Sequence, residues 1–387
     1  MVKARDVLRE DHLKSFITEL YDGDLHAKRV LSLAHGTLGV LTSASLAVHA
    51  IGQGLSHARG TLSKHGIKQA DRLLSNTGID LNEFFSYWVP HVIGAREEIV
   101  VALDWTSFAR DAHDTLMLSM LTEHGRATAL MWETVPSATL KDNRNRYEDE
   151  LLYRFSKVVP EGVGVTVVAD RGFADCNLFK YLEEQLGFGY VIRLPASYYV
   201  TSESGERRLA SQWVGPAGRT RTLRGAQLTD AHLLTVGTVV CLRDKNMKDA
   251  WCLVASDRNV APRVLIRYYA KRWGIETSFR DLKDPRYGLG LSSMRVSRPD
   301  RRDRLLLLSV LAIALLSLLG AAGERIGYDR WLKANTVKHR THSLFRQGHM
   351  LYEHIPNWPT QRLRPLLDEF ATMLAEHRMY KRMFAIL

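Results

Sequence analysis

Residues 269–283 read Tyr269-Ala-Lys-Arg-Trp-Gly-Ile-Glu-Thr-Ser-Phe-Arg-Asp-Leu-Lys283. This stretch predicts a single helix that begins at Pro262, because proline is tolerated in the first turn of a helix. The helix is expected to end at Asp284, since the proline that follows disfavours helical backbone in the residue before it.

One narrow face of the expected helix carries an unusual set of side chains. At about 100° per residue, four of them fall on the same side. They are Tyr269, Arg272, Glu276 and Lys283. Trp273 and Arg280 border this face. A lone carboxylate among cationic and aromatic groups is poorly suited to burial, and it suits a surface that binds a polyanion with a metal ion at one point.

Two interpretations of this face stay open from the residues alone. Glu276 has Arg272 four residues before it and Arg280 four residues after it, so an ordinary solvated helix with ion pairs would give the same pattern. However, the spacing of Tyr269, Arg272, Glu276 and Lys283 resembles the signature helix of the YREK group of DDE transposases, the cut-and-paste enzymes of the bacterial insertion-sequence-four family. The following Tyr287-Gly-Leu-Gly-Leu also resembles the sequence after that helix in the family.

Upstream, the pattern changes to strands, and two of them end on an aspartate. The apolar run Ile99–Leu103 is followed by Asp104, and the run Val163–Ala169 by Asp170. Taken singly, an aspartate in this position is more often a turn or cap residue. On neighbouring strands, however, the two carboxylates would meet at one edge of the sheet, where their repulsion is unfavourable unless a cation lies between them.

The expected order of elements from residue 98 onward is βββαβαβ, which is that of a ribonuclease-H-like sheet. The expected strands are 99–103, 115–121, 127–133, 163–169 and 190–194, with a turn at His124-Gly125 and helices at 142–158 and 175–186. The fold class is therefore α/β: a ribonuclease-H-like catalytic domain (residues 96–195 and 259–325) with a β-rich insertion (196–258), flanked by helical regions at 1–95 and 326–387.

The resemblance implies the roles of these residues. Asp104, Asp170 and Glu276 match the three catalytic acids, which hold two Mg²⁺ ions per site, with Mn²⁺ able to substitute. All-oxygen ligands suit Mg²⁺. The side chains implied to contact the phosphates of the DNA are Tyr269, Arg272 and Lys283, flanked by Trp273 and Arg280. Rival interpretations are a transposase-derived DNA-binding protein and a simple nuclease.

Trp251 begins a short strand-like run within the insertion. A tryptophan at the start of a strand is most often a core residue. In the family resemblance it aligns with an aromatic side chain on which hairpin-forming relatives stack a flipped base.

The N-terminal region, residues 1–95, has helical periodicity throughout. Within Ser63–Asn76, three basic side chains recur at helical spacing: Lys64, Lys68 and Arg72. They fit either a solvated helix face or a DNA contact, and the resemblance favours DNA because the family has a similar segment in its helical DNA-binding domain.

Charge and composition bound the remaining possibilities. The chain has 387 residues and a net charge of +11, with most of the positive excess from residue 263 onward, as expected of a surface that lies along phosphates. Three cysteines without metal-ligand spacing favour a reducing compartment, and no signal peptide is expected, so we predict a cytoplasmic protein. The run Leu305–Leu319 is shorter than the ~20 residues of a membrane span and predicts a buried core helix.

The resemblance implies double-stranded DNA as partner and a homodimer on paired ends, with pairing through residues 326–387.

Overall fold

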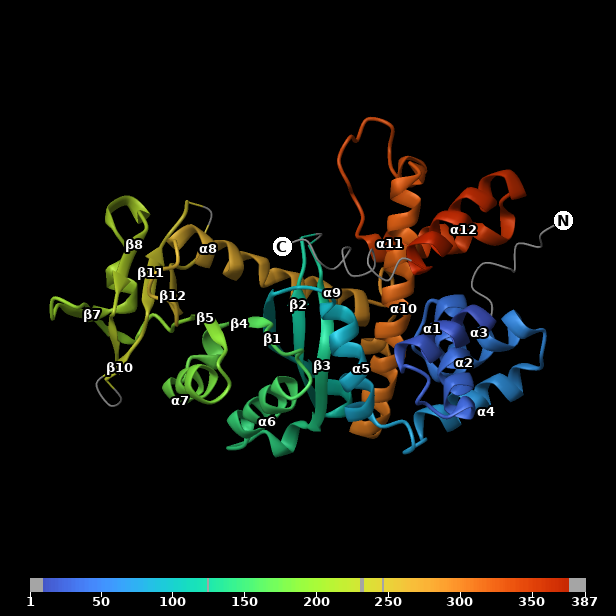
Figure 1. Ribbon diagram of the computed structural model, residues 1–387, viewed down its shortest axis with the longest axis horizontal. Helices are drawn as coiled ribbons and strands as arrows, with labels where there is room; N and C mark the ends of the chain where they lie inside the picture. The colour runs from blue at the N-terminus through green and yellow to red at the C-terminus, as the bar shows by residue number, and fades with distance from the viewer. Residues whose placement is uncertain (1–9, 124, 230–232, 246, 376–387) are drawn as a thin grey trace.

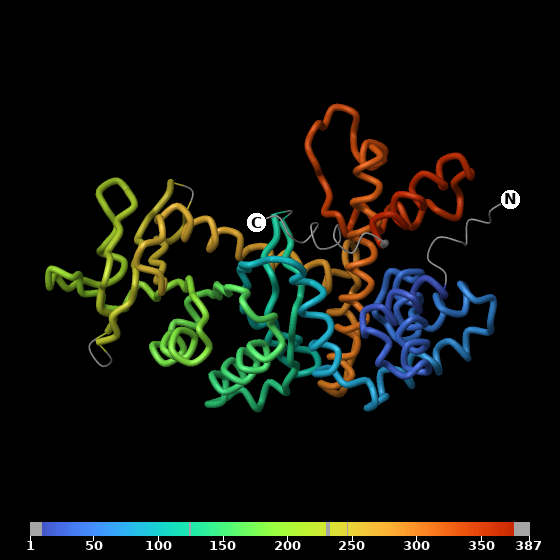
Figure 2. Tube along the Cα trace, in the orientation of Figure 1, coloured from blue at the N-terminus to red at the C-terminus, as the bar shows by residue number. Residues whose placement is uncertain are grey.

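The computed structural model describes residues 10–123, 125–229, 233–245 and 247–375. Figure 1 shows an elongated molecule in which a central sheet has a small β-rich part on one side and a group of helices on the other. Figure 2 shows that the first helices of the chain (blue) and the last ones (red) lie at the same end of the molecule. The fold is mixed α/β with helices flanking the sheet, in agreement with the expected class.

The central sheet has eight strands in the order β3-β2-β1-β4-β5-β12-β11-β8. Its strands are β1 (Glu98–Phe108), β2 (His113–Leu121), β3 (Ala127–Pro136), β4 (Gly164–Ala169), β5 (Gly189–Arg193), β8 (Arg221–Arg224), β11 (Thr238–Leu242) and β12 (Trp251–Ala255). The β1–β4 and β4–β5 pairs are parallel, and the other pairs are antiparallel. The five strands expected between residues 98 and 194 are all present; of the turn expected before β3, His124 lies outside the described residues.

The β-rich segment after β5 does two things. Three of its strands, β8, β11 and β12, extend the central sheet beyond β5. The others form a small second sheet in the order β10-β9-β6-β7. These strands are β6 (Tyr199–Thr201), β7 (Arg207–Leu209), β9 (Gln227–Leu228) and β10 (Leu234–Thr235). The segment is thus continuous with the main sheet through the β12–β5 pairing.

The helices that follow the strands are shorter than the sequence predicts. They are α6 (Arg144–Ser156), α7 (Cys176–Lys180), the π-helical turn Tyr181–Gln185, α8 (Pro262–Lys271) and α9 (Trp273–Lys283). The prediction of one unbroken helix from Pro262 to Lys283 was wrong. The chain forms two helices that meet at Arg272, where the local backbone is still α-helical (φ −51°, ψ −32°).

Short 3-10 turns connect several of these elements. They span Ala109–Asp111, Ser137–Thr139, Arg171–Phe173, Ala210–Trp213, Pro216–Gly218, Leu291–Ser293, Tyr328–Leu332 and Ile355–Asn357.

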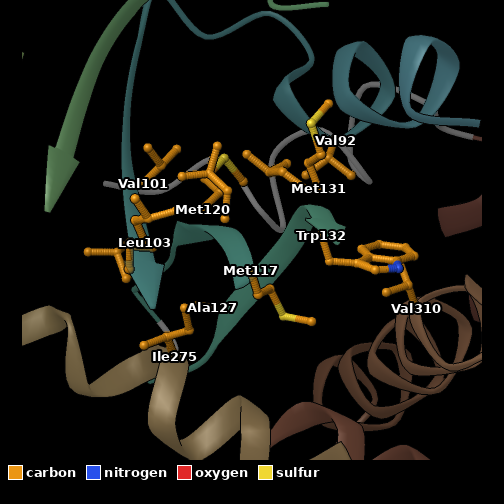
Figure 3. Packing of buried hydrophobic residues seen from close by; sticks show 14 of the residues in the cluster. Val92, Val101, Leu103, Met117, Met120, Ala127, Met131, Trp132, Ile275 and Val310 are labelled. Carbon is orange, nitrogen blue, oxygen red and sulfur yellow. The ribbon is translucent and has the colours of Figure 1, made fainter. Parts of the chain in front are cut away.

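Helix α10 (Pro299–Arg325) packs against elements from several parts of the chain: it contacts β3, α2, α11 and α12. Trp132 of β3 donates its indole N–H to the carbonyl oxygen of Asp303 at 3.3 Å. Figure 3 shows Val310 of α10 beside Trp132, and Ile275 of α9 beside Ala127 of β3. A Cβ on Gly348 of α11 would lie 1.7 Å from the carbonyl oxygen of Leu316, so only glycine permits the close crossing of α10 and α11.

The apolar run in α10 is a core helix, as predicted. The 18-residue window that is most apolar has a mean hydropathy of 2.7 and is 89% buried within the protein. Among the described residues, α10 is the single unbroken helix long and apolar enough to cross a membrane; α2 and α3 together would require ignoring a bend of 95°. Burial against the sheet and neighbouring helices accounts for its composition.

The flanking regions are helical where the structure describes them. The N-terminal helices are α1 (Glu10–Leu20), α2 (Ala27–Ser43), α3 (Val48–Arg59), α4 (Ser63–Leu74) and α5 (Leu81–Ile93). The C-terminal helices are α11 (Leu344–His354) and α12 (Thr360–Ala375). Residues 1–9 and 376–387, included in the predicted flanking domains, lie outside the described residues.

Candidate active site

Asp104 and Asp170 occupy equivalent positions in the register of two neighbouring central strands, β1 and β4. The last pair in the parallel register of β1 and β4 is Leu103 with Ala169; Asp104 is the next residue of β1, and Asp170 is the first residue after β4. The prediction that Asp104 ends its strand was wrong, because β1 continues to Phe108 through antiparallel pairing with β2. The pairing with β4 does stop before it, so both carboxylates stand where the parallel pair separates.

Asp170 is fixed by a local turn. Its Oδ1 accepts a hydrogen bond from the backbone N–H of Gly172 at 2.7 Å, which caps the 3-10 turn Arg171–Phe173. Phe173 is buried and anchors the turn in the core. The conformation of the loop therefore sets where the Asp170 carboxylate points.

Helix α9 is fastened to the edge of the sheet, which sets the position of Glu276. The hydroxyl of Ser278 accepts from the N–H of Ala127 and donates to the carbonyl of the same residue, both at 2.9 Å. One turn further along, Asp281 pairs with Arg126 at 2.6 Å. These contacts fix α9 against the start of β3, and the helix also contacts β1.

Arg272 joins two of the three acids. Its guanidinium donates to Asp104 Oδ2 at 3.2 Å and to Glu276 Oε1 at 2.7 Å. Arg272 is buried, whereas the Glu276 side chain is 35% exposed. The ion pair expected of a simple solvated helix is thus present, but it is part of a buried bridge that reaches β1. No ion pair joins Arg280 to Glu276 in the described part of the chain.

The charges around Asp104 act on its pKa in opposite directions. Burial raises the pKa of Asp104 to about 6, and the negative charges of Asp170 and Glu276 add to the rise, while Arg272 opposes it. Repulsion among three carboxylates is unfavourable unless a cation compensates it. Arg272 supplies part of that compensation.

The carboxylates are not arranged as a metal cluster in this structure. Within the described ranges, no three Asp, Glu, His or Cys side chains lie close enough together to hold a metal ion. Their chemistry nevertheless fits a hard divalent cation: all donors are oxygens, and they already share one cation, Arg272. Arg272 occupies one oxygen of Asp104 and one of Glu276, so it competes with a metal ion for these two oxygens.

Tyr269 and Trp251 continue the site beyond Arg272. Their rings meet edge to face with centroids 4.8 Å apart, and the Arg272 guanidinium carbon lies 5.8 Å from the Tyr269 ring centroid. Tyr269 is buried and Trp251 is half-buried. Trp251 is therefore three contacts away from Glu276, with Tyr269 and Arg272 between them.

Lys283 lies at the far end of the same face. Its ammonium donates to the carbonyl of Ser107 at 2.7 Å and lies 4.4 Å from the centroid of the Phe108 ring. Burial lowers the pKa of Lys283. Trp273, 58% exposed, and Arg280, also exposed, border the face as expected.

A family model described as a transposase DDE domain matches residues 97–315, which is more than half of the chain. The protein belongs to the DDE transposase family. No curated protein matches the chain. The matched range contains Asp104, Asp170 and Glu276, and enzymes of this family generally use divalent metal ions.

The basic side chains of α4 lie apart from the acids of the transposase. Lys64, Lys68 and Arg72 are exposed on one helix, on the opposite side of α10 from the central sheet (Figure 1). Arg72 also borders a cavity of about 520 Å³, whose lining includes Lys28 and His35. A role for α4 in DNA binding stays a prediction.

Sequence reasoning missed a second layer around the aspartates of the transposase. Glu148 of α6 is buried and accepts from the Trp105 indole N–H at 2.7 Å and from Arg144 Nε at 3.0 Å. The spacing of Arg144 and Glu148 was a visible signal of a helical ion pair. Their proximity to Trp105, which follows Asp104, depends on the fold.

Proposed function

We propose that this DDE transposase has the YREK signature of the insertion-sequence-four family, binds the terminal inverted repeats of an insertion sequence, cleaves the DNA at the ends and joins them to target DNA. The observation that carries the proposal is the bridge through Arg272. It links Asp104 to Glu276, with Asp170 on the neighbouring strand, in a chain of the DDE family.

The acids are proposed to hold two Mg²⁺ ions, or Mn²⁺ in their place. Asp104 would contact both ions, and Asp170 and Glu276 one each. When bound, the ions would stabilise charge on the attacking and leaving oxygens of an in-line phosphoryl transfer. The raised pKa of Asp104, about 6, still leaves it mostly ionised at neutral pH and available as a ligand.

The cationic face orients the DNA strand. Once released from Asp104 and Glu276, the planar guanidinium of Arg272 can bind a phosphate through two parallel hydrogen bonds. Tyr269 and Lys283 would contact phosphates on either side of it, with Trp273 and Arg280 at the border. Arg272 would thus change partners, from the two carboxylates to a phosphate, when metal ions occupy the acids and DNA is bound.

The second strand is proposed to be cut through a hairpin. The 3′-hydroxyl freed by the first cut attacks the opposite strand, which requires a sharp bend in the DNA. Trp251 would stack a flipped base and recover roughly 1–3 kcal/mol. Its half-buried ring, held against Tyr269, supports this role.

The proposed division of the chain follows from these roles. Residues 96–195 and 259–325 would form a ribonuclease-H-like catalytic domain with 196–258 as its insertion, and the strand order β3-β2-β1-β4-β5 supports this. Residues 1–95 would bind the DNA ends through Lys64, Lys68 and Arg72. Residues 326–387 would pair two subunits, and the protein would act in the cytoplasm.

The test uses the DNA that flanks the coding region of this chain. Labelled duplexes carrying either flank are incubated with the purified protein and Mg²⁺, and with Asp104→Asn. We expect strand cleavage at the boundary of an inverted repeat by the wild type, and binding without cleavage by the variant. Binding of both flanks without cleavage under any divalent ion would favour a DNA-binding protein instead.

A further inference from the structure

Arg144 projects from the start of α6 into the edge of the active site. Its guanidinium carbon lies 5.5 Å from the ring centroid of Trp105 and 5.6 Å from that of Phe173. Trp105 is the residue after Asp104, and Phe173 belongs to the turn that Asp170 caps. The guanidinium is therefore stacked between the two segments that carry the aspartates.

One side of this guanidinium is anchored and the other is open. Nε donates to the buried Glu148 at 3.0 Å, while the Arg144 side chain is 46% exposed. Its two Nη groups donate no hydrogen bond to any residue in the described ranges. Anchoring at Nε leaves the pair of Nη donors oriented, without the rotamer freedom of a solvated arginine.

The space in front of these donors lies beside Gly172. A Cβ added to Gly172 would be 4.0 Å from Arg144 Nη2 and 3.0 Å from Asp170 Oδ1. In the described residues Arg144 and Asp170 form no ion pair. The Nη groups of Arg144 therefore face this space without a bond to Asp170, while Nε is paired with Glu148. A glycine keeps the space clear.

We propose that Arg144, stacked between Trp105 and Phe173, forms a seat for one phosphate of the DNA strand next to Asp170. The inference rests on the proposed function, because it assigns a contact of the strand being cut. An oriented guanidinium recognises a phosphate through two hydrogen bonds, and here it also offsets the negative charge that a phosphate meets near Asp170. The seat is separate from the face of Arg272 and Lys283, since it belongs to α6.

The first test compares Arg144→Ala with Arg146→Ala. Arg146 is exposed on the same helix and has no ion pair in the described part of the chain, so both variants lose one charge at nearly the same place. We expect Arg144→Ala to flatten the salt dependence of DNA binding by about one unit of slope and to slow cleavage about 10- to 100-fold. Arg146→Ala should change neither.

The second test locates the phosphate. A series of duplexes carries one neutral methylphosphonate at successive positions around the cleavage site. At one position, neutralisation should slow the wild type as much as Arg144→Ala does and should not slow Arg144→Ala further. Gly172→Ala, which fills the seat and keeps every charge, should show the same insensitivity. Additive losses at every position would overturn the proposal.

A structural explanation is tested separately. Without Arg144, Glu148 keeps a charge in a buried place, and the variant could be impaired for that reason. The double variant Arg144→Ala/Glu148→Gln retains an acceptor for Trp105 without that charge. If the double variant recovers wild-type cleavage and salt slope, Arg144 acts only through Glu148 and the seat is refuted.

The outcomes also separate this inference from the proposed function. If the wild type cleaves the ends and Arg144→Ala matches Arg146→Ala in slope and rate, the seat fails and the function stands. If the wild type cleaves no DNA but Arg144→Ala alone changes the salt slope, the seat stands and the function fails.

Discussion

Arg272→Ala should strengthen divalent metal binding to the DNA-free protein. The guanidinium competes with a metal ion for Asp104 Oδ2 and Glu276 Oε1, and the substitution removes that competitor. Two unit charges about 4 Å apart interact by about 4 kcal/mol at an effective dielectric constant of 20. Because the Glu276 side chain is 35% exposed, solvent screening reduces the net penalty of displacement to about 1.5–3 kcal/mol in total.

A penalty of that size corresponds to about 10- to 100-fold tighter binding in the variant. The assay is titration with Mn²⁺, followed by electron paramagnetic resonance of the free ion, on wild type, Arg272→Ala and Arg280→Ala. Arg280 lies on the same helix and is exposed, so it controls for the loss of one positive charge. Equal affinities in all three proteins, or weaker binding in Arg272→Ala, would refute the idea that Arg272 holds the acids in place of a metal. Cleavage by Arg272→Ala should still be slow, since its phosphate contact is lost.

Three further outcomes follow from the geometry. Lys283→Ala should flatten the salt dependence of end binding by about one unit of slope, and an unchanged slope in a filter-binding titration would leave Lys283 as a structural contact of Ser107. Trp251→Ala should leave the first nick intact and slow hairpin formation, with partial rescue by an abasic nucleotide at the flipped position; equal loss of nicking and hairpin on a denaturing gel would make Trp251 merely structural. The Asp104 carboxyl, whose pKa is about 6, must lose its proton to bind a metal, so Mn²⁺ affinity should be constant well above pH 6 and fall as the pH is lowered through 6. Calorimetric affinities that stay flat from pH 7.5 to pH 5 would contradict that assignment.

The sequence predicts the strands and the order of elements because buried strands appear in it as runs of apolar residues. The run Val163–Ala169 is apolar apart from Thr166, as is typical of a central parallel strand, and β4 ends at Ala169 as expected. For β1 the apolar run gives the wrong end. Its continuation past Asp104 depends on pairing with β2, which a local pattern does not contain.

The extension of the central sheet by β8, β11 and β12 is difficult to predict from the sequence for the same reason. Strands β8, β11 and β12 have four or five residues each and lie in a Gly-, Arg- and Thr-rich segment. Short strands carry little periodicity, so their pairing with β5 rather than with the small sheet follows from contacts distant in the sequence.

In the candidate site, too, contacts between residues close in the sequence can be predicted, whereas contacts between distant residues cannot. A pair between Arg272 and Glu276 follows from helical spacing alone. The contact of Arg272 with Asp104 spans 168 residues and requires the docking of α9 through Ser278. The layer of Arg144 and Glu148 behind the aspartates likewise appears only once α6 is folded against β1.

The substitution Asp170→Cys tests whether the Asp170 carboxylate holds a metal ion during DNA strand cleavage, as we propose for the three acids. Thiolate is a softer ligand than carboxylate and binds Mg²⁺ poorly but Mn²⁺ better. The measurement is single-turnover cleavage of an end duplex in Mg²⁺ and in Mn²⁺, with Asp175→Cys as the control, since Asp175 caps α7 through the N–H of Asn177. We predict that Asp170→Cys is inactive in Mg²⁺ and regains cleavage in Mn²⁺, while Asp175→Cys responds to the two ions as the wild type does. Cleavage by Asp170→Cys in Mg²⁺ at the wild-type rate would show that Asp170 is not a metal ligand.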